Sequence, residues 1–347
     1  MRLEKKIMSY ESLQILWFIL IAVLWIGFFF LEGFDFGVGM LLPFLGKKDI
    51  ERRAIINAIG PTWDGNEVWL IAAGGAMFAA FPHWYATMFS GFYLALFLLL
   101  IGLIIRGISF EYRSKDAAPK WRHTFDWMIA VGSFMVALLL GAAFANLARG
   151  VPIDENMMFT GNLFTLLNPY GLLGGLTTVS VFLLHGANFL GLKLEGELRE
   201  RAGKFAKNLW IAASLLYVGL GIFTYVAGFW ARGFVNPGIV PIAAVAVLLA
   251  AGYFINHKRS GWAFILVALN IVLTQITFFS MTFPNVMLST TDPAYSLTIY
   301  NASSSQYTLT VMSFVALIFV PIVLAYQGWT YWMFRKRISS DKKTLVY

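Results

Sequence analysis

Long apolar runs are the feature that most constrains how this chain can fold. One of them, LWFILIAVLWIGFFF at residues 16–30, holds no charged residue, and similar runs recur along the whole length. About 20 mostly apolar residues suffice to cross a lipid bilayer as a helix. The chain is 59% hydrophobic and 13% charged, whereas soluble domains are about a quarter charged. The sequence therefore predicts one all-α polytopic membrane domain over residues 1–347.

The apolar runs give about nine candidate membrane-spanning helices. They lie at residues 14–42, 67–82, 84–106, 127–148, 170–190, 209–231, 238–256, 262–283 and 309–334. The second is short and ends at the sequence FPH, residues 81–83. The first run is long and no small-residue cleavage site follows it, so we expect a retained helix and not a cleaved signal peptide.

The placement of basic residues predicts how the chain is oriented. Of 26 Lys and Arg residues, 21 lie in the tail or in the segments after the first, third, fifth and seventh spans. The remaining five are Arg2, Lys5, Lys6, Arg149 and Arg232. Cytoplasmic segments of membrane proteins are enriched in Lys and Arg. We therefore expect the N-terminus outside and the C-terminus in the cytoplasm. The net charge of +8 indicates membrane orientation and no nucleic-acid partner.

A short pattern recurs in the two halves of the chain. LEGFDF at residues 31–36 ends the first span, and LHGANF at residues 184–189 ends the fifth. This predicts two four-helix bundles, a first repeat at 14–148 and a second at 170–283, with a peripheral ninth helix at 309–334. Chance matching between short apolar helices is the competing explanation.

Two acidic residues stand inside the first apolar span. Glu32 and Asp35 are three residues apart, so they share one face of a helix. An ionised acid at mid-membrane costs about 2.5–3.5 kcal/mol on insertion scales, which favours an inward-facing position. Glycines at 33, 37 and 39 leave room for a neighbouring helix backbone to approach closely.

Other acids cluster at the same end of the predicted bundle. Asp64 and Glu67 begin the second span, Glu111 follows the third and Asp126 begins the fourth. Arg106 and Arg113 are available as partners at this end. Buried or crowded carboxyl groups take up protons more readily, so the cluster could conduct protons from the cytoplasm. The other interpretation is structural: Asp64 caps its helix, Glu111 and Asp126 pair with nearby arginines, and Glu32 and Asp35 bind a neighbouring helix or subunit.

Several kinds of site are excluded or disfavoured. The chain has no cysteine, which excludes disulfides, thiolate metal sites and iron–sulfur clusters. It has four histidines, and only His185 falls within a predicted span. No two histidines share one depth on two helices, so we expect no bis-histidine haem site and a polar contact for His185. The glycines of GFDFGVG lack the spacing of a nucleotide-binding loop.

Several blocks of the sequence resemble subunit II of the bacterial cytochrome bd quinol oxidases. They are GFDFGVGMLLPFLG, ERRAIINAIGPTWDGNEVWLIAAGGAMFAAFP, FSGFYLALFLLLIGLIIRGISFEYRSK, TGNLFTLLNPYGLLGG and NASSSQYTLTVM. The resemblance covers nearly the whole chain, and the WDGNEVW and FEYRSK blocks are its most specific parts.

The resemblance implies a subunit that supports an enzyme without ligating its haems. Such oxidases oxidise quinol and reduce dioxygen to water in the cell membrane, and this chain would form a heterodimer with subunit I. Two haems b and one haem d would be held by subunit I, where quinol and dioxygen act. A small single-helix third subunit is a partner that the resemblance leaves open.

The resemblance also implies site residues. Glu32, Asp35, Asp64 and Glu111 fall on acidic positions of the family, in which a cytoplasmic proton path is thought to touch subunit II. Trp63 matches a position near which some relatives bind a structural quinone, a site that is not general to the family. An ion-coupled transporter with a 4+4 helix repeat is the alternative function, although the acidic ends occur mainly in the first repeat.

Overall fold

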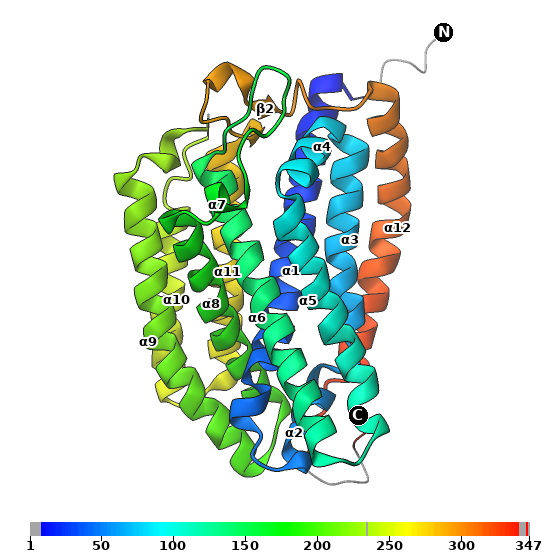
Figure 1. Ribbon diagram of the computed structural model, residues 1–347, viewed down its shortest axis with the longest axis vertical. Coiled ribbons are helices and arrows are strands. Elements are labelled where there is room, and N and C mark those ends of the chain that lie inside the picture. Colours follow the sequence, from blue (N-terminus) through cyan, green and yellow to red (C-terminus); the bar gives the residue numbers. More distant parts are fainter. Residues whose placement is uncertain (1–7, 234, 340–344, 346–347) are drawn as a thin grey trace.

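The computed structural model describes residues 8–233, 235–339 and 345, which form helices running roughly along one axis (Figure 1). Among the described residues, seven helices are long and apolar enough to cross a membrane. They are α1 (Tyr10–Leu45), α5 (Tyr93–Tyr112), α6 (Pro119–Arg149), α8 (Pro169–Lys193), α9 (Gly196–Val226), α11 (Ser260–Thr282) and α12 (Gln306–Met333). The all-α class is thus confirmed.

Two shorter helices lie among these seven. They are α3 (Trp63–Ala80) and α10 (Val240–Asn256), and both run alongside the long helices in Figure 1. α10 is apolar but has 17 residues, and α3 carries acidic residues in its first turns. The number of nine membrane crossings therefore stays a prediction.

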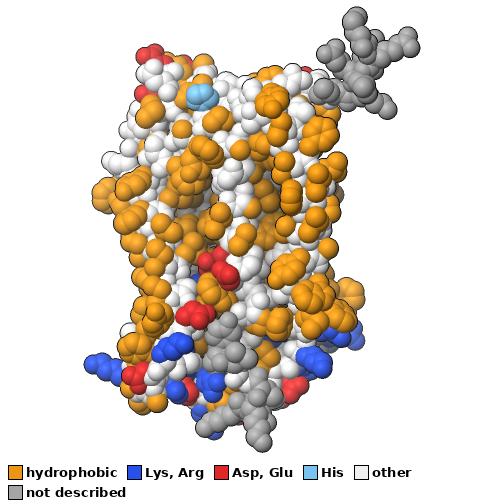
Figure 2. Space-filling view, turned by 90° about the vertical axis from the view of Figure 1, so that its right-hand side faces the viewer, with side chains coloured by type: hydrophobic (Ala, Val, Ile, Leu, Met, Phe, Trp, Pro, Cys, Tyr) orange, Lys and Arg blue, Asp and Glu red, His pale blue; other side chains and the backbone are white. Residues whose placement is uncertain are grey.

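The remaining elements cap the two ends of the bundle. α2 (Asp49–Ile59) lies at the end that gathers most Lys and Arg side chains, here called the basic end (Figures 1 and 2). The opposite end carries α4 (Pro82–Gly91), α7 (Leu163–Leu166) and the antiparallel strands β1 (Asn285–Met287) and β2 (Leu297–Thr298). Three short 3₁₀ turns complete the set: η2 (Arg113–Lys115), η3 (Phe229–Ala231) and η4 (Pro293–Tyr295).

Local sequence explains where several helices begin. Ser9 accepts a hydrogen bond from the Ser12 N–H at the start of α1, and Ser305 does the same for Thr308 at the start of α12. Asn168 caps α8 and is followed by proline at the first helical position. Such side chains satisfy backbone N–H groups that have no partner within the helix, and proline has none to satisfy.

The structure corrects two predicted segments. The span expected at 84–106 is divided, because α4 ends at Gly91 and α5 starts at Tyr93. A Cβ atom at Gly91 would stand 2.6 Å from Phe159, so the loop after α6 crosses close to this break. The span expected at 209–231 instead starts at Gly196 and ends at Val226.

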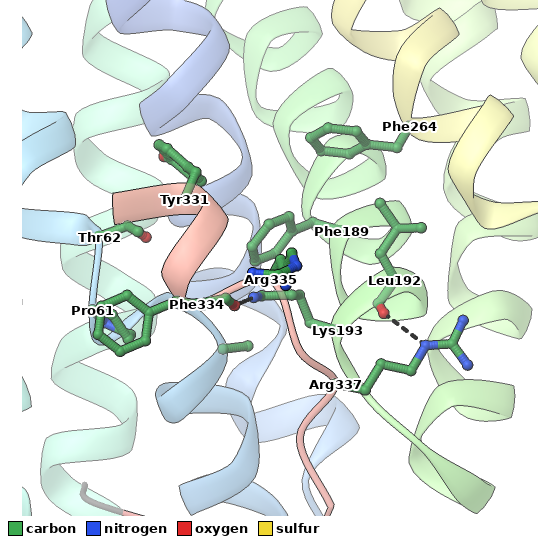
Figure 3. Close-up of a pocket in the computed structure, with 11 residues that line it drawn as sticks. Pro61, Thr62, Phe189, Leu192, Lys193, Phe264, Tyr331, Phe334, Arg335 and Arg337 are labelled. Carbon is green, nitrogen blue, oxygen red and sulfur yellow. Dashed lines mark hydrogen bonds between the residues drawn. The ribbon is translucent and has the colours of Figure 1, made fainter. Parts of the chain in front are cut away.

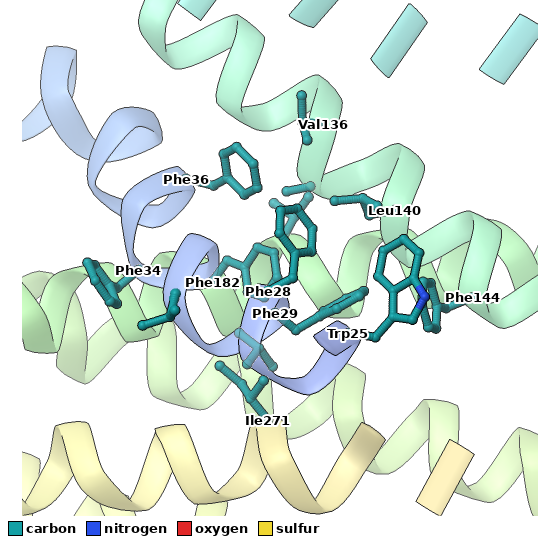
Figure 4. Close-up of a cluster of buried hydrophobic side chains, with 14 of the residues drawn as sticks. Trp25, Phe28, Phe29, Phe34, Phe36, Val136, Leu140, Phe144, Phe182 and Ile271 are labelled. Atoms are coloured by element: carbon teal, nitrogen blue, oxygen red, sulfur yellow. The ribbon is translucent and has the colours of Figure 1, made fainter. Parts of the chain in front are cut away.

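The core surrounds α1, which packs against α3, α6, α8 and α11. Figure 4 shows its centre, where Trp25 and Phe29 of α1 meet Phe144 of α6 and Phe182 of α8. The Trp25–Phe144 and Phe29–Phe144 ring centroids are 5.0 and 4.8 Å apart in edge-on geometry, which suits aromatic pairs.

The described charges agree with the predicted asymmetry. Arg149 and Arg232 lie together away from the basic end, where the Arg232 side chain donates a hydrogen bond to the Arg149 carbonyl. Arg2, Lys5, Lys6, Lys342 and Lys343 lie outside the described residues.

Candidate functional site: a buried cluster of carboxyl groups

Glu32 and Asp35 of α1 are both fully buried, as their shared helix face predicts. The helix can hold them inside because its glycines let neighbours approach. The Gly33 position faces the Phe182 ring, and the Gly37 position faces the Phe182 carbonyl and the Gly186 N–H. The acids therefore lie at the level where α1 and α8 cross closely, on the side of α1 that contacts α3 and α5.

Arg106 of α5 is the cation of this cluster. Its guanidinium is fully buried, lies 3.5 Å from a Glu32 carboxylate oxygen and donates a hydrogen bond to Glu67 of α3. The 3.5 Å contact is an ion pair without a hydrogen bond, since neither Glu32 oxygen is bonded to a described residue. The guanidinium carbon also lies 4.9 and 5.1 Å from the centroids of the Phe36 and Phe110 rings, within the range of cation–π attraction.

Asp35 is tied to α3 and α12 through Asn66. The Asn66 amide donates to an Asp35 oxygen at 2.6 Å. Its own carbonyl oxygen accepts from the Tyr331 hydroxyl at 2.8 Å and from the Gln327 amide at 3.2 Å. The Gln327 oxygen in turn accepts from the Trp69 indole at 2.9 Å. A continuous hydrogen-bonded chain therefore links α12 to the carboxyl group on α1.

The cluster has an excess of acid. Glu32 and Glu67 pair with the single guanidinium of Arg106, which also interacts electrostatically with Asp35. Unpaired charge away from water is costly. The cluster is neutral only when two of its three carboxyl groups carry a proton.

The other predicted site residues lie nearer the surface. Asp64 and Glu111 are exposed, and neither forms an ion pair with a described residue. Figure 2 shows acidic side chains interrupting the apolar surface above the basic end. The helix-cap role considered for Asp64 is wrong, because α3 starts at Trp63 and Asp64 lies within its first turn. Trp63 itself is half-buried, with its ring 4.9 Å from Phe110.

Asp126 pairs with nearby arginines, which is the structural role considered for it in the sequence analysis. It accepts hydrogen bonds from Arg113 at 2.5 Å and from Arg52 at 2.8 Å. Arg113 also bonds Asp49 at 2.9 Å. These pairs fasten α2 against η2 and α6, and within the described residues Asp126 makes no ion pair with the buried carboxyl cluster.

A second ion pair fixes α2 on its other side. Glu51 pairs with Arg201 of α9 and accepts hydrogen bonds from the backbone N–H groups of Lys47 and Lys48. Burial alone would raise the pKa of Glu51, but the bonds from Arg201 and from these N–H groups hold it below its usual value. Glu51 is therefore an anionic anchor for α2.

His185 makes the polar contact predicted for it. The residue is fully buried, and its Nε2 lies 3.2 Å from the Phe30 carbonyl oxygen. Its ring stacks on Phe264, with 4.5 Å between centroids and 9° between planes. The imidazole is thus held between α1 and α11 by its edge and its face.

Sequence reasoning missed four members of the network: Asn66, Trp69, Gln327 and Tyr331. None of them carries a charge, and two lie on α12, far along the chain from α1. One signal was available: Gln327 is the single amide inside the apolar run of the last helix, and polar residues within spans face partners more often than lipid.

Comparison with known proteins identifies the family. Residues 13–334 match the family model for cytochrome bd terminal oxidase subunit II. The chain is 43% identical to cytochrome bd ubiquinol oxidase subunit 2 of Bacillus subtilis (strain 168), covering 97% of this chain and 99% of that one. It is 41% identical to cytochrome bd-I ubiquinol oxidase subunit 2 of Escherichia coli (strain K12), covering 96% and 97%.

A solved structure supports the same fold. A chain of the bd oxidase from Geobacillus thermodenitrificans superposes with a TM-score of 0.75 at 16% identity, covering 94% of this chain and 100% of that one. With the family model matched over most of the sequence, the chain belongs to the cytochrome bd terminal oxidase subunit II family.

Proposed function

We propose that the buried carboxyl cluster passes protons from the basic end toward the oxygen chemistry of the oxidase. As subunit II of a terminal oxidase, the chain works in a bacterial membrane beside a partner subunit I. Reduction of dioxygen to water consumes protons, which must reach a site closed to bulk solvent. An ion-coupled transporter is not favoured, because the family model spans residues 13–334.

The observation that carries this proposal is the shared arginine. Glu67 is partly accessible, with 18% of its side chain exposed, and it shares Arg106 with the fully buried Glu32. Exposed Asp64 and Glu111 lie on the same two helices as Glu67 and Arg106. The residues therefore form a series from the surface to the interior, with Asp35 and Asn66 beside its buried end.

We also propose that the chain holds no haem and that the complex keeps its haems in subunit I. His185 already bonds a backbone carbonyl and stacks on Phe264, so its ring has little freedom to turn toward a metal. The expected result is that the lone chain, expressed without subunit I, shows no haem absorbance. Stoichiometric haem in the lone chain would contradict the proposal.

Substitution of Asp35 tests the proton path. Asp35→Asn keeps the size of the side chain and one acceptor for the Asn66 amide, but it cannot release a proton. We expect oxygen consumption by the purified complex to fall at least tenfold, the equivalent of about 1.4 kcal/mol in barrier height. Assembly and the reduced-minus-oxidised haem spectrum should stay unchanged.

Glu155→Gln is the matched control, because Glu155 is an exposed acid in the loop after α6. It should leave turnover unchanged. Normal turnover in Asp35→Asn would refute proton transfer through this carboxyl group. Loss of the assembled complex would instead support a purely structural role for the cluster.

Three finer points remain predictions. The quinone contact implied for Trp63 is compatible with its half-buried ring beside Arg106, whose guanidinium carbon lies 5.7 Å from the ring centroid. The small third subunit rests on the resemblance alone. A cytoplasmic basic end follows from the distribution of Lys and Arg.

A further inference from the structure

A cavity of about 360 Å³ opens at the basic end, apart from the carboxyl cluster (Figure 3). Residues of α8, α11 and α12, together with the segment between α2 and α3, form its walls. Its floor is the chain after α12, which is pinned to the end of α8 by a 2.7 Å hydrogen bond from the Ile338 N–H to the Lys193 carbonyl.

The charged lining of this cavity has one sign. Among the described residues around it, the ionisable side chains with a formal charge are Lys193, Arg335 and Arg337, and all are cationic. Each donates to a backbone carbonyl: Lys193 to Phe334, Arg335 to Trp332 at 2.6 Å and Arg337 to Leu192 at 3.2 Å. An ammonium has three donors and a guanidinium five, so each cation keeps N–H groups for a ligand.

The other walls are aromatic and aliphatic. Phe189 of α8 and Phe264 of α11 line the cavity, and Tyr331 of α12 closes it toward the interior. The cavity lies at the level where α8 ends at Lys193 and α12 ends at Met333. A site with cations at a helix end and apolar rings above them matches the boundary between lipid headgroups and acyl chains.

We propose that this cavity binds the phosphate of an anionic phospholipid from the leaflet at the basic end. The phosphate lies among Lys193, Arg335 and Arg337, and the adjoining acyl chain lies against Phe189 and Phe264. Phosphate accepts several charge-assisted hydrogen bonds, and both guanidinium and ammonium groups supply them. A lipid is favoured over free phosphate because the walls include large apolar rings that a free ion would leave uncovered.

Such a lipid would brace the helix that completes the carboxyl cluster. α12 packs on α1 and α3, but Leu309 is the only buried residue along this described helix. Tyr331 lines the cavity and also donates to Asn66, the partner of Asp35. A headgroup that ties α12 to α8 therefore acts two hydrogen bonds away from a buried carboxyl group.

The test uses the complete oxidase complex, stripped of lipid in detergent. Native mass spectrometry would measure retention of added phosphatidylglycerol against phosphatidylcholine with the same acyl chains. Each Lys or Arg near a membrane surface contributes about 1 kcal/mol to anionic lipid binding, roughly a fivefold change in affinity. We expect Arg335→Gln to weaken phosphatidylglycerol binding about fivefold, and replacement of Lys193, Arg335 and Arg337 together to weaken it on the order of 100-fold.

The matched control removes three exposed basic-end charges outside the cavity, Lys120, Lys204 and Lys207. It should leave the retained lipid unchanged. Three results would overturn the proposal: equal retention of the two lipids by the unmodified complex, equal loss in control and cavity variants, or full displacement of the lipid by millimolar inorganic phosphate. If the triple variant does not assemble, the site is still tested by the lipid preference of the unmodified complex and by the Arg335→Gln variant.

Discussion

Arg106 is the residue on which the buried cluster depends. It is fully buried, faces three carboxyl groups, and lies over the rings of Phe36 and Phe110. Removing one partner of a buried ion pair leaves an uncompensated charge and costs about 3–5 kcal/mol, more than the pair itself contributes. The guanidinium is therefore needed even if the pairs add little net stability.

Arg106→Gln should sharply reduce recovery of the assembled complex, because Glu32 and Glu67 lose their cation. The double variant with Glu32→Gln should recover part of the loss, since one buried acid is then gone. Arg122→Gln is the control: its side chain is 29% exposed and pairs with exposed Asp49, so it should cost less than about 1 kcal/mol. Size-exclusion yield and the thermal unfolding midpoint would be measured for the single, double and control variants. An equal yield and midpoint for Arg106→Gln and Arg122→Gln would show that the cluster needs no cation.

How far the sequence predicts this site differs between its members. Glu32 and Asp35 were predictable, because an acid inside an apolar run has to face inward. Arg106 was predictable as a possible partner at the same end of the bundle, but its specific pairing with Glu32 and Glu67 was not, since it lies some 70 residues along the chain from Glu32. Asn66 and Tyr331 were still harder to predict. A neutral side chain lacks the high cost of membrane insertion that marks a charged residue as a buried partner.

At the scale of elements, the crossing of α1 and α8 positions the site. A Cβ atom at Gly37 would meet the Phe182 carbonyl, and one at Gly186 would meet the backbone of Gly37 and Val38. Small residues at such a point let two membrane helices pack backbone to backbone. The crossing brings α8 to the side of α1 opposite its acidic contacts with α3 and α5.

Gly37→Ala should therefore destabilise the bundle by about 1–3 kcal/mol, the usual cost of overpacking a tight core. Gly203→Ala on α9 is the matched control, since a Cβ atom added there would have no neighbour within 4 Å. Alanine favours a helix over glycine by up to about 1 kcal/mol, so the control should be neutral or slightly stabilising. Thermal unfolding of the two purified complexes measures the difference, and an unchanged midpoint in Gly37→Ala would mean that α8 can move away freely.

The helix contacts also bear on the predicted repeat. α1 packs on α3 and α6, while α8 packs on α9 and α11 in the corresponding way. The α5–α6 pair has its counterpart in α10–α11, and α6–α8 has one in α1–α11. These correspondences support our proposal of two related four-helix units. The sequence did not predict the break between α4 and α5. The residue that crowds Gly91 is Phe159, which lies in the loop after α6 and is distant in sequence.

At the scale of the whole molecule, the face shown in Figure 2 is mainly apolar around its middle and carries Lys and Arg side chains at one end. Large side chains on α12 such as Phe314, Leu317 and Tyr326 are well exposed. In a membrane subunit, such surface faces lipid or the partner subunit. The side of the membrane from which our proposed proton path takes up protons then depends on which side the basic end faces.

Single introduced cysteines can decide this orientation, because the chain has none of its own. Lys204 is exposed at the basic end, and Glu155 is exposed in the loop after α6. The positive-inside rule places Lys204 in the cytoplasm. A membrane-impermeant maleimide should therefore label Glu155→Cys in intact spheroplasts and Lys204→Cys only after permeabilisation. The reverse pattern would place exposed Asp64 and Glu111 on the outer side, so protons entering there would come from outside the cell and the proposed cytoplasmic path would be wrong.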